Sequence, residues 1–339
     1  MMSLLGPLVE VRRIGTGPVI HEGMDQRMHE RGRTSEGVGH YTNINGPSVI
    51  RVPSWVRGPP LARYYMYFAH HKGSYIRMAY SDAVGGPWTV YKPGVLAIAD
   101  SGFPTVRPKD DDPDRVKTEA ELAGSDELRP HVASPDCIVD DENRRLVLLF
   151  HGLEGQPQAS TQLSRVATSI DGVTWSVEPG TIGRPYMRGF RAPSILGNDW
   201  FSLSMPGNFY RSTSGGMPPW TVRETRQTCG KRYLFTPKMR HSAVLVRDDE
   251  LWVFWTRVGD APERILLSRV ALSADWADWA LLPPPLNATG GCSGGGMMEI
   301  EVLRPELEWE GASIPPEPSQ RGCVPRSTMG HARIKPCIY

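Results

Sequence analysis

The 339-residue sequence lacks several features by which common protein classes are identified. It has almost no stretch with the hydrophobic period of an amphipathic helix, which argues against a helical bundle. No apolar run is long enough to span a membrane, and the opening MMSLLGPLVEVRR contains no secretory hydrophobic region. We therefore expect a cytoplasmic protein that does not associate with membranes.

Charge of one sign is also lacking, since the formal net charge is only +1. Without a basic field over the chain, nucleic acid is not an expected partner. Cysteine is scarce, and an odd number of five without any CxxC spacing argues against a zinc ribbon. Free thiols in a reducing compartment are expected instead. The five are Cys137, Cys229, Cys292, Cys323 and Cys337.

Glycine and proline are abundant, with 35 and 31 residues spread along the chain. They separate short runs rich in Val, Ile, Tyr and Trp, which is the pattern of an all-β fold with many turns. These runs recur in one order. A first strand opens with a small residue and proline, an acidic or Asn/Gly turn leads to an aromatic second strand, and Trp marks a fourth strand.

Four short strands per unit, repeated along the chain, predict a five-bladed β-propeller of four-stranded antiparallel blades, with residues 1–339 in one domain. The last blade is expected to be incomplete or closed by the N-terminus, and an irregular β-sandwich is the alternative fold. Trp88, Trp175, Trp220 and Trp279 are expected to pack between blades. The predicted segments are blades at about 40–95, 131–180, 188–225 and 238–280, a charged insertion at 97–130, a linker at 283–298 and a partial fifth blade at 299–339.

This repeat resembles the five-bladed propeller glycoside hydrolases, the superfamily of arabinanases, β-xylosidases, invertases and levansucrases. Families 43 and 117 are the most similar. The resemblance covers about residues 40–280 and depends on the motifs GPSVI, SPDCIVDDE, RAPSIL and YIRMAYSD…GPWTVY. It implies a central pocket that binds an oligosaccharide or polysaccharide.

The resemblance to family 43 implies three catalytic carboxyl groups. A first-blade Asp before a proline is the general base, a second-blade Asp after a proline tunes the acid, and a later Glu is the general acid. Asp136 in SPD matches the second of these. Gly46 precedes Pro47 where the base is expected, and Arg191 stands where the family usually has Glu. The chain is therefore divergent at two of the three positions.

Histidines, amides and arginines stand at the inner positions instead. In one interpretation, histidine supplies acid and base catalysis because its ordinary pKa is about 6.5. The resemblance to family 117 implies a histidine acid, which makes His241 a candidate beside His131 and Asp136. The arginines would bind an acidic group of the substrate in a bidentate fork. The expected substrate-binding residues are Asn43, Asn45, His70, His71, His151, Arg191 and Arg257.

A second interpretation is metal binding, although no local motif such as HExxH supports it. The ligands would be His70, His131, His151 and Asp136. Two structural alternatives also stay open. His70 and His71, in FAHH, compare with His151 in LFHG and would be hydrogen-bonded strand-end residues without chemistry. Arg191 and Asp136 would form a structural ion pair.

The functional prediction is a carbohydrate-active enzyme without a required cofactor. We expect a glycoside hydrolase that acts on an oligosaccharide with acidic or modified sugars. One alternative is a lyase that eliminates from a uronic acid, because elimination needs a base and a neutralised carboxylate but no pair of carboxyls. Another is a non-catalytic propeller that binds a glycan or a protein.

Overall fold

The structure is a computed structural model in which residues 9–25, 29–34, 37–42, 44–70, 73–106, 130–154, 161–212, 222–226, 234–235, 238–283, 299–307 and 310 are described. Asn43 and His71, both expected in the site, lie outside these ranges, as does Trp220. Within the ranges, no helix is long and apolar enough to cross a membrane.

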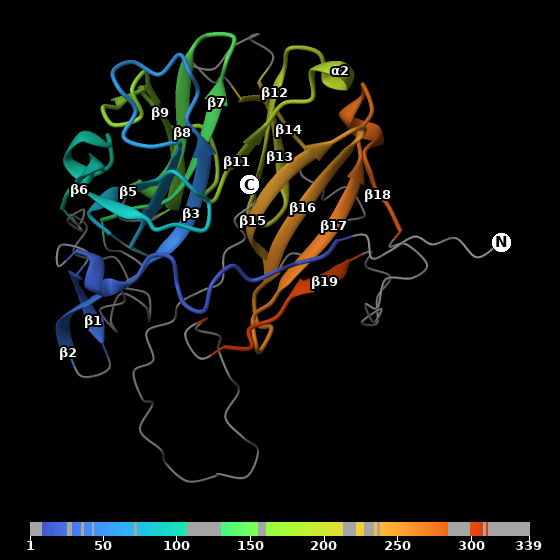
Figure 1. Cartoon of the computed structure of the whole chain (residues 1–339). Coiled ribbons are helices and arrows are strands. Elements are labelled where there is room, and N and C mark those ends of the chain that lie inside the picture. The colour runs from blue at the N-terminus through green and yellow to red at the C-terminus, as the bar shows by residue number, and fades with distance from the viewer. Residues whose placement is uncertain are drawn as a thin grey trace, which may run out of the picture. The chain divides into compact units, whose positions relative to one another are not determined.

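Four antiparallel sheets dominate the described chain (Figure 1). The first consists of β3 (Asn45–Arg51), β4 (Tyr64–Ala69), β5 (Tyr75–Ser81) and β6 (Thr89–Ala97). The second consists of β7 (Val132–Asp140), β8 (Arg145–Glu154), β9 (Thr161–Ser169) and β10 (Ser176–Val177). The third consists of β11 (Arg188–Phe190), β12 (Trp200–Ser204), β13 (Asn208–Ser212) and β14 (Val222–Arg226). The fourth consists of β15 (Met239–Arg247), β16 (Glu250–Arg257), β17 (Ile265–Ala271), β18 (Ala280–Leu281) and β19 (Ile300–Leu303).

Each sheet runs through four strands in chain order, which is the strand pattern of a propeller blade. The prediction of an all-β, propeller-like fold is confirmed, whereas the described residues form four such sheets and not five. Residues 300–303 lie in the segment expected to be a partial fifth blade, but β19 pairs with β17 and extends the fourth sheet. β18 occupies only Val270 and Ala271 of β17, so the rest of that strand edge is open to β19.

Smaller elements connect and flank the sheets. β1 (His29–Thr34) and β2 (Gly37–Thr42) form a hairpin that the sequence pattern does not predict. Three short 3₁₀ helices are η1 (Glu22–Met24), η3 (Ile98–Asp100) and η5 (Trp276–Asp278). The acidic turn between β7 and β8 behaves as expected, because Asp140 accepts hydrogen bonds from the backbone and side chain of Asn143 at 3.3 and 2.9 Å.

The RAPSIL segment is a correction to the predicted strand pattern. Since a first strand of the repeat opens with a small residue and proline, RAPSIL predicts a first strand, but β11 ends at Phe190 and Pro193–Leu196 form the one-turn helix α2. Proline is favoured in the first turn of a helix because it has no backbone N–H to donate. Arg191 therefore lies between a strand and a helix, not within a strand.

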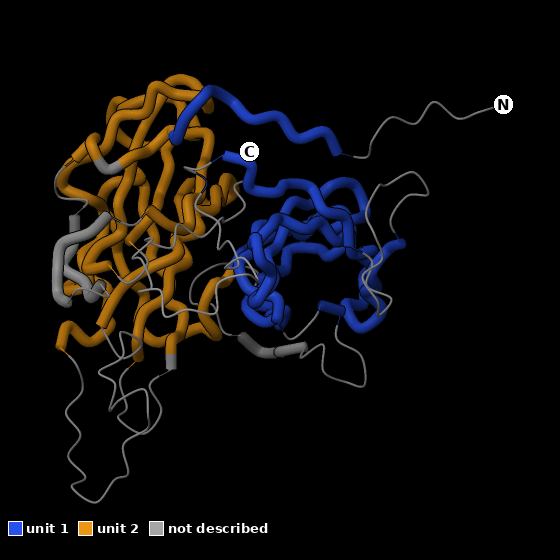
Figure 2. Tube along the Cα trace, turned by 90° about the horizontal axis from the view of Figure 1, so that it is seen from below, with its two compact units in different colours: residues 1–18, 188–320, 331–338 blue, residues 19–187, 321–330, 339 orange. Residues whose placement is uncertain are grey.

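The chain divides into two compact units (Figure 2). Unit 2 comprises Val19–Met187, Arg321–Gly330 and Tyr339, and it contains the first two sheets. Unit 1 comprises Met1–Pro18, Arg188–Gln320 and His331–Ile338, and it contains the other two. Each unit buries apolar side chains between its own pair of sheets, so each has its own core.

Tryptophans and tyrosines fill these two cores. In unit 2, the Trp175 ring from the second sheet meets Tyr67 of the first sheet edge to face, with ring centroids 5.6 Å apart. In unit 1, Trp279 is buried against Phe201 and Phe209 at centroid distances of 5.2 Å each. Trp88 is buried on the other face of the first sheet with Ile20. The expected packing between blades is confirmed for Trp175 and Trp279, whereas Trp88 packs against its own sheet and the N-terminal segment.

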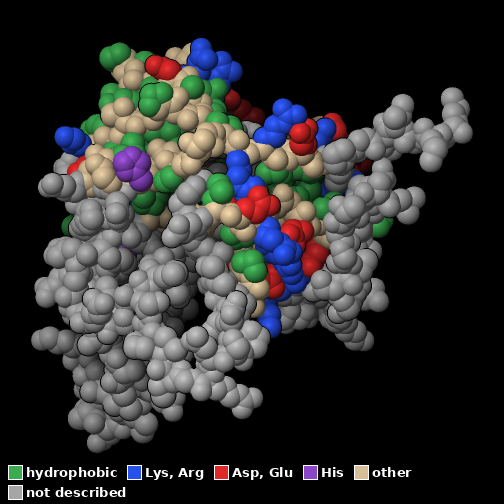
Figure 3. Space-filling view, turned by 60° about the horizontal axis from the view of Figure 1, so that its bottom comes forward, with side chains coloured by type: hydrophobic (Ala, Val, Ile, Leu, Met, Phe, Trp, Pro, Cys, Tyr) green, Lys and Arg blue, Asp and Glu red, His purple; other side chains and the backbone are tan. Residues whose placement is uncertain are grey.

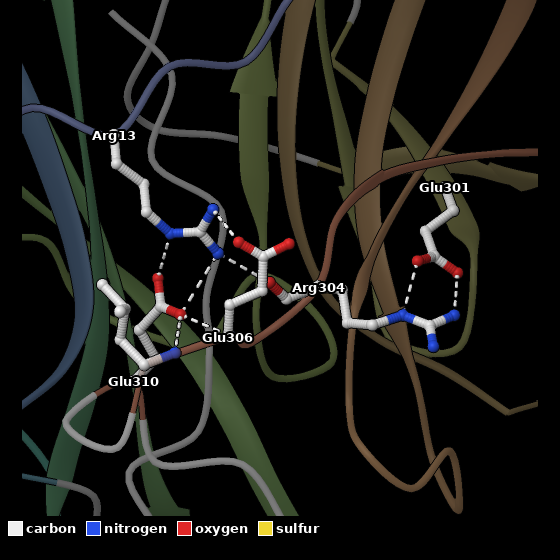
Figure 4. A network of polar contacts seen from close by, with 6 residues as sticks. Arg13, Glu301, Arg304, Glu306 and Glu310 are labelled. Atoms are coloured by element: carbon white, nitrogen blue, oxygen red, sulfur yellow. Dashed lines mark hydrogen bonds and ion pairs between the residues drawn. The ribbon is translucent and has the colours of Figure 1, made fainter.

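In unit 1, the N-terminal segment is joined to the chain that follows β19 (Figure 4). Arg13 donates to the Glu310 carboxylate at 2.7 and 3.1 Å and to the Glu306 carboxylate at 3.0 Å. It also donates to the Arg304 carbonyl oxygen at 2.7 Å. Acidic and basic side chains are intermingled on the face shown in Figure 3, which agrees with the balanced net charge.

Candidate functional site

Three of the four sheets share a two-residue irregularity in their first strand. In the second sheet, Ala133 pairs with His151 and Asp136 pairs with Leu149. Ser134 and Pro135 therefore both lie opposite Phe150, the single residue between Leu149 and His151 on β8. Such β-bulges re-aim side chains and are common beside active sites.

The first and fourth sheets repeat this bulge. Gly46–Pro47 lie opposite Phe68 in the first sheet, and Arg240–His241 lie opposite Thr256 in the fourth. Gly46 and Ser134 both have left-handed backbone, with φ of 59° and 50°. A serine rarely adopts this conformation, so the second sheet forms the bulge even without a glycine to favour it.

The shared bulge aligns the sheets residue by residue. The residue after it is Ser48, Asp136 or Ser242, so only the second sheet places a carboxylate there. The residue just before the bulge pairs with Ala69 in the first sheet, with His151 in the second and with Arg257 in the fourth. The comparison of His70 with His151 is therefore wrong by one position, because His70 follows the aligned residue. Side chains alternate between faces along a strand, so this shift moves His70 to the other face.

In unit 2 two of the predicted histidines meet. His131 and His151 are both buried, and their ring centroids lie 5.9 Å apart at an interplanar angle of 86°. The ring of Tyr186 lies 4.5 Å from that of His151. The backbone N–H of Tyr186 donates to His151 Nδ1 at 3.4 Å. Tyr186 is a residue that the strand pattern does not identify, because it lies between two sheets in a segment without periodicity.

Asp136 lies on the same face of the second sheet as His151. It pairs with Leu149, which is two residues before His151 on β8, and directly paired residues share a face. The next residue, Cys137, points into the core between the two sheets. Burial, and then the charge of Asp136, raise the pKa of the Cys137 thiol well above its ordinary value. Cys137 is thus a protonated core thiol and not a nucleophile.

Unit 1 places charged residues at the corresponding bulge. His241 is completely buried, and its neighbour Arg240 forms an ion pair with Glu263 through contacts of 2.7 and 2.6 Å. The guanidinium of Arg188 donates to the Ser242 carbonyl oxygen at 2.7 Å. The fourth-sheet bulge therefore consists of an ion-paired guanidinium and a buried imidazole, and a guanidinium of the third sheet donates to the residue that follows it.

The two arginines predicted to bind an acidic substrate group differ in their contacts. Arg257 forms ion pairs with Glu299 and, at 3.8 Å, with Asp260. Its positive charge is therefore already balanced by protein carboxylates. The guanidinium of Arg191 lies over the Trp200 ring, 5.0 Å from its centroid.

The predicted residues thus fall into two sets. Unit 2 holds Asn45, His70, His131, Asp136 and His151, of which His131 and His151 are in ring contact. Unit 1 holds Arg191, His241 and Arg257. Among the described residues, no group of three or more His, Cys, Asp or Glu side chains is arranged to hold a metal ion. The proposed set of His70, His131, His151 and Asp136 therefore does not form a metal site there.

The known proteins to which this chain is similar have low sequence identity with it. No family model matches the chain. A protein of Acanthamoeba polyphaga mimivirus, "Uncharacterized protein R118", is 28% identical over 298 residues, which are 83% of this chain and 73% of the viral protein.

Solved structures of GH43 and related enzymes are similar at low identity. They include an exo-β-1,3-galactanase from Phanerochaete chrysosporium (12% identity, 75% of this chain, 53% of that chain, TM-score 0.45). The GH43 BlXynB protein from Bacillus licheniformis is 13% identical (71% of this chain, 41% of that chain, TM-score 0.47). This chain thus spans about half of the galactanase and two fifths of BlXynB.

Proposed function

We propose that this chain is a carbohydrate-active enzyme, a glycosidase that acts on an oligosaccharide with acidic or modified sugars. The observation that carries the proposal is the bulge shared by the first strands of three sheets. Asp136, His241 and Asn45 lie within or next to these bulges, where the sequence resembles the propeller glycoside hydrolases. Bulges re-aim side chains and are common next to active sites.

The proposed roles follow from the chemistry of each side chain. His241 and His131 serve as acid and base, since an imidazole exchanges protons near neutral pH. The carboxylate of Asp136 favours the charged form of a histidine near it. Arg191, whose guanidinium lies over Trp200, binds an acidic group of the sugar. Asn45, buried in the first sheet, binds a sugar hydroxyl group.

A non-catalytic glycan-binding protein is the second candidate, and one observation favours it. The positions aligned with Asp136 are Ser48 and Ser242, so the three bulges together supply one carboxylate. Hydrolysis by an inverting pair of carboxyls needs two. A uronate β-eliminating lyase needs only one base with a neutralised substrate carboxylate, and it remains the third candidate.

A substrate screen distinguishes these functions. The chain is incubated with nitrophenyl glycosides and with uronate oligosaccharides, and products are followed by nitrophenol release, by reducing ends and by the ultraviolet absorbance of an unsaturated uronate. A glycosidase gives the first two signals, and a lyase gives a reducing end with the absorbance. Binding measured by calorimetry without any product identifies a glycan-binding protein.

Two variants test the assignment of the site. We expect Asp136→Asn and His241→Ala each to lower kcat/KM by at least about 100-fold, in the range of a lost acid or base. His21→Ala, on the exposed N-terminal segment, is the matched control and should retain full activity. Unchanged turnover in both site variants would falsify the assignment.

A further inference from the structure

The segment that connects the second sheet to unit 1 is anchored at one residue. Ser164, on β9, makes three hydrogen bonds with it. The Ile182 N–H donates to the Ser164 carbonyl oxygen at 2.8 Å, the Ser164 N–H donates to the Gly183 carbonyl oxygen at 2.8 Å, and the Ser164 hydroxyl donates to the Arg184 carbonyl oxygen at 2.7 Å. Ser164 is also the residue that pairs with His151 across β8 and β9. The anchor therefore brings the segment directly beside the His151 ring.

Tyr186 completes this contact in an unusual conformation. Its backbone φ is +64°, a left-handed value that residues with a side chain rarely adopt. In that conformation its N–H donates to His151 Nδ1 and its ring lies 4.5 Å from the imidazole. Non-glycine residues in such backbone often mark functional sites, because the surrounding structure has to hold them there.

The hydrogen bond decides which nitrogen of His151 carries its proton. A neutral imidazole has one donor and one acceptor nitrogen. Because Nδ1 accepts from the Tyr186 N–H, the proton of the neutral ring resides on Nε2. Protonation of Nδ1 would place two N–H groups against each other and break the bond.

We infer that Tyr186 is a positioning residue that holds His151 as a neutral Nε2–H hydrogen-bond donor. This inference deepens the proposed function, on which its ligand depends. His151 then donates to a sugar oxygen and does not act as a base, whereas His131, which it meets edge to face, keeps the proton-transfer role. The polar neighbours that face or flank the ring include His131, Ser164, Tyr186 and Asp136.

The tautomer can be measured without any sugar. The full chain is labelled with ¹⁵N-histidine, and long-range ¹H–¹⁵N correlation spectra near neutral pH report which ring nitrogen is protonated, with His151→Gln supplying the assignment. We expect an unprotonated Nδ1 and a protonated Nε2 for His151. A proton on Nδ1, or on both nitrogens, overturns the inference.

Three variants separate the positioning role from a merely structural one. Tyr186→Phe keeps the ring and should keep the tautomer. Tyr186→Gly suits the left-handed backbone, so the protein should fold. Without the ring packed against the imidazole, residue 186 is no longer held in place, so its N–H should leave His151 Nδ1 part of the time and give a mixture of tautomers. Ser164→Ala leaves both partners intact, removes one anchor bond, and should give a smaller shift in the same direction. Spectra of Tyr186→Gly and Ser164→Ala that both match the wild type overturn the inference.

Measurements of sugar binding separate a failure of the role of Tyr186 from a failure of the proposed function. Calorimetry with a uronate oligosaccharide should show a roughly tenfold loss of affinity in Tyr186→Gly and none in Tyr186→Phe. If the wild type binds no sugar but shows the expected tautomer, the proposed function fails and the positioning of His151 stands. If sugar binds with equal affinity to all three proteins, the role of Tyr186 is refuted while the proposed function survives.

Discussion

The two units use the same strand bulge to present different chemistry. In unit 2, the polar groups around the second-sheet bulge are the imidazoles of His131 and His151 with the single carboxylate of Asp136. In unit 1, the fourth-sheet bulge carries Arg240, whose guanidinium is paired with Glu263. Neutral imidazoles can be buried at the cost of their hydrogen bonds, whereas buried guanidinium groups need carboxylate partners. The difference teaches that the fourth-sheet bulge depends on a matched charge pair and the second-sheet bulge on the packing of aromatic rings.

The largest expected effect comes from removing the carboxylate that pairs with Arg240 in unit 1. Glu263→Gln leaves the Arg240 guanidinium without its carboxylate in a site where both side chains are largely buried, at 15% and 8% exposure. We expect the free energy of unfolding to fall by about 3 kcal/mol, the usual cost of an uncompensated buried charge. Urea denaturation followed by tryptophan fluorescence measures it.

A double variant sharpens this test. Arg240→Met with Glu263→Gln removes the charge as well as its partner and should recover most of the lost stability, because no unpaired charge remains. His131→Gln is the matched change in unit 2, where no guanidinium is left unpaired, and it should cost less than Glu263→Gln. If His131→Gln costs as much as Glu263→Gln, the contrast between the two units is wrong.

The next effect tests the fit of rings in unit 2. A Cβ on Gly152 would lie 2.4 Å from the His131 carbonyl oxygen and 2.5 Å from the Phe103 ring. Since the backbone oxygen cannot move aside cheaply, we expect Gly152→Ala to destabilise the protein by about 2 kcal/mol, as overpacking does. The change should also displace His131, which the histidine ¹⁵N spectra detect.

Gly17→Ala is the control for this substitution, because a Cβ there meets nothing within 4 Å. It should leave both the midpoint of thermal unfolding and the histidine spectra unchanged. Equal thermal midpoints for Gly152→Ala and Gly17→Ala would show that the space around His131 is less tight than we describe.

The smallest effect concerns the exposed charges that join the N-terminal segment to unit 1. The hydrogen bonds from Arg13 lower the pKa of Glu310 from 4.5 to about 2. A lowered carboxyl pKa adds stability at pH values above 4.5, and this stability is lost as the pH falls towards 2. We expect Arg13→Ala to cost less than about 1 kcal/mol at neutral pH, because the pair is near the surface.

The pH dependence distinguishes this pair from ordinary packing. The difference in thermal midpoint between wild type and Arg13→Ala should shrink as the pH is lowered through this range. Arg12→Ala removes a neighbouring arginine whose partner Glu10 is also exposed, and it should show no such trend. A deficit in Arg13→Ala that stays constant down to pH 2 contradicts the role of Glu310.

Local patterns are sufficient to predict much of the fold. The all-β class and the four-stranded repeat follow from alternating apolar runs and acidic turns, and the turn at Asp140 forms as its residue types require. Short-range signals also explain the errors. Pro193 favours both an edge strand and the first turn of a helix, and only the tertiary context selects α2. The pairing of β19 with β17 depends on how much of β17 is covered by β18, which no periodicity reports.

The candidate site was less accessible to sequence reasoning. Asp136 stands out through its SPD motif, and the histidines through their places near strand ends. The alignment of His151 with Ala69 depends on bulges in two separate sheets, and a one-residue shift reverses the face of a side chain. Tyr186 has no sequence signal at all, because its left-handed backbone belongs to a segment that is held by the bond from Ser164 to Arg184 and by the contact of Tyr186 with His151.

The bonds from Arg13 to Glu306 and Glu310 have a consequence for the order in which the parts of the chain fold during synthesis. Arg13 and Glu310 are 297 positions apart, so the segment that carries Arg13 leaves the ribosome long before its partner exists. Unit 2 draws its two sheets from the uninterrupted stretch 19–187 and can fold during synthesis, as domains commonly do. Unit 1 has to wait for the last third of the chain before its first residues find their place. Residues 19–187 can therefore fold first, and the N-terminal segment joins unit 1 only after residues near 310 have been made.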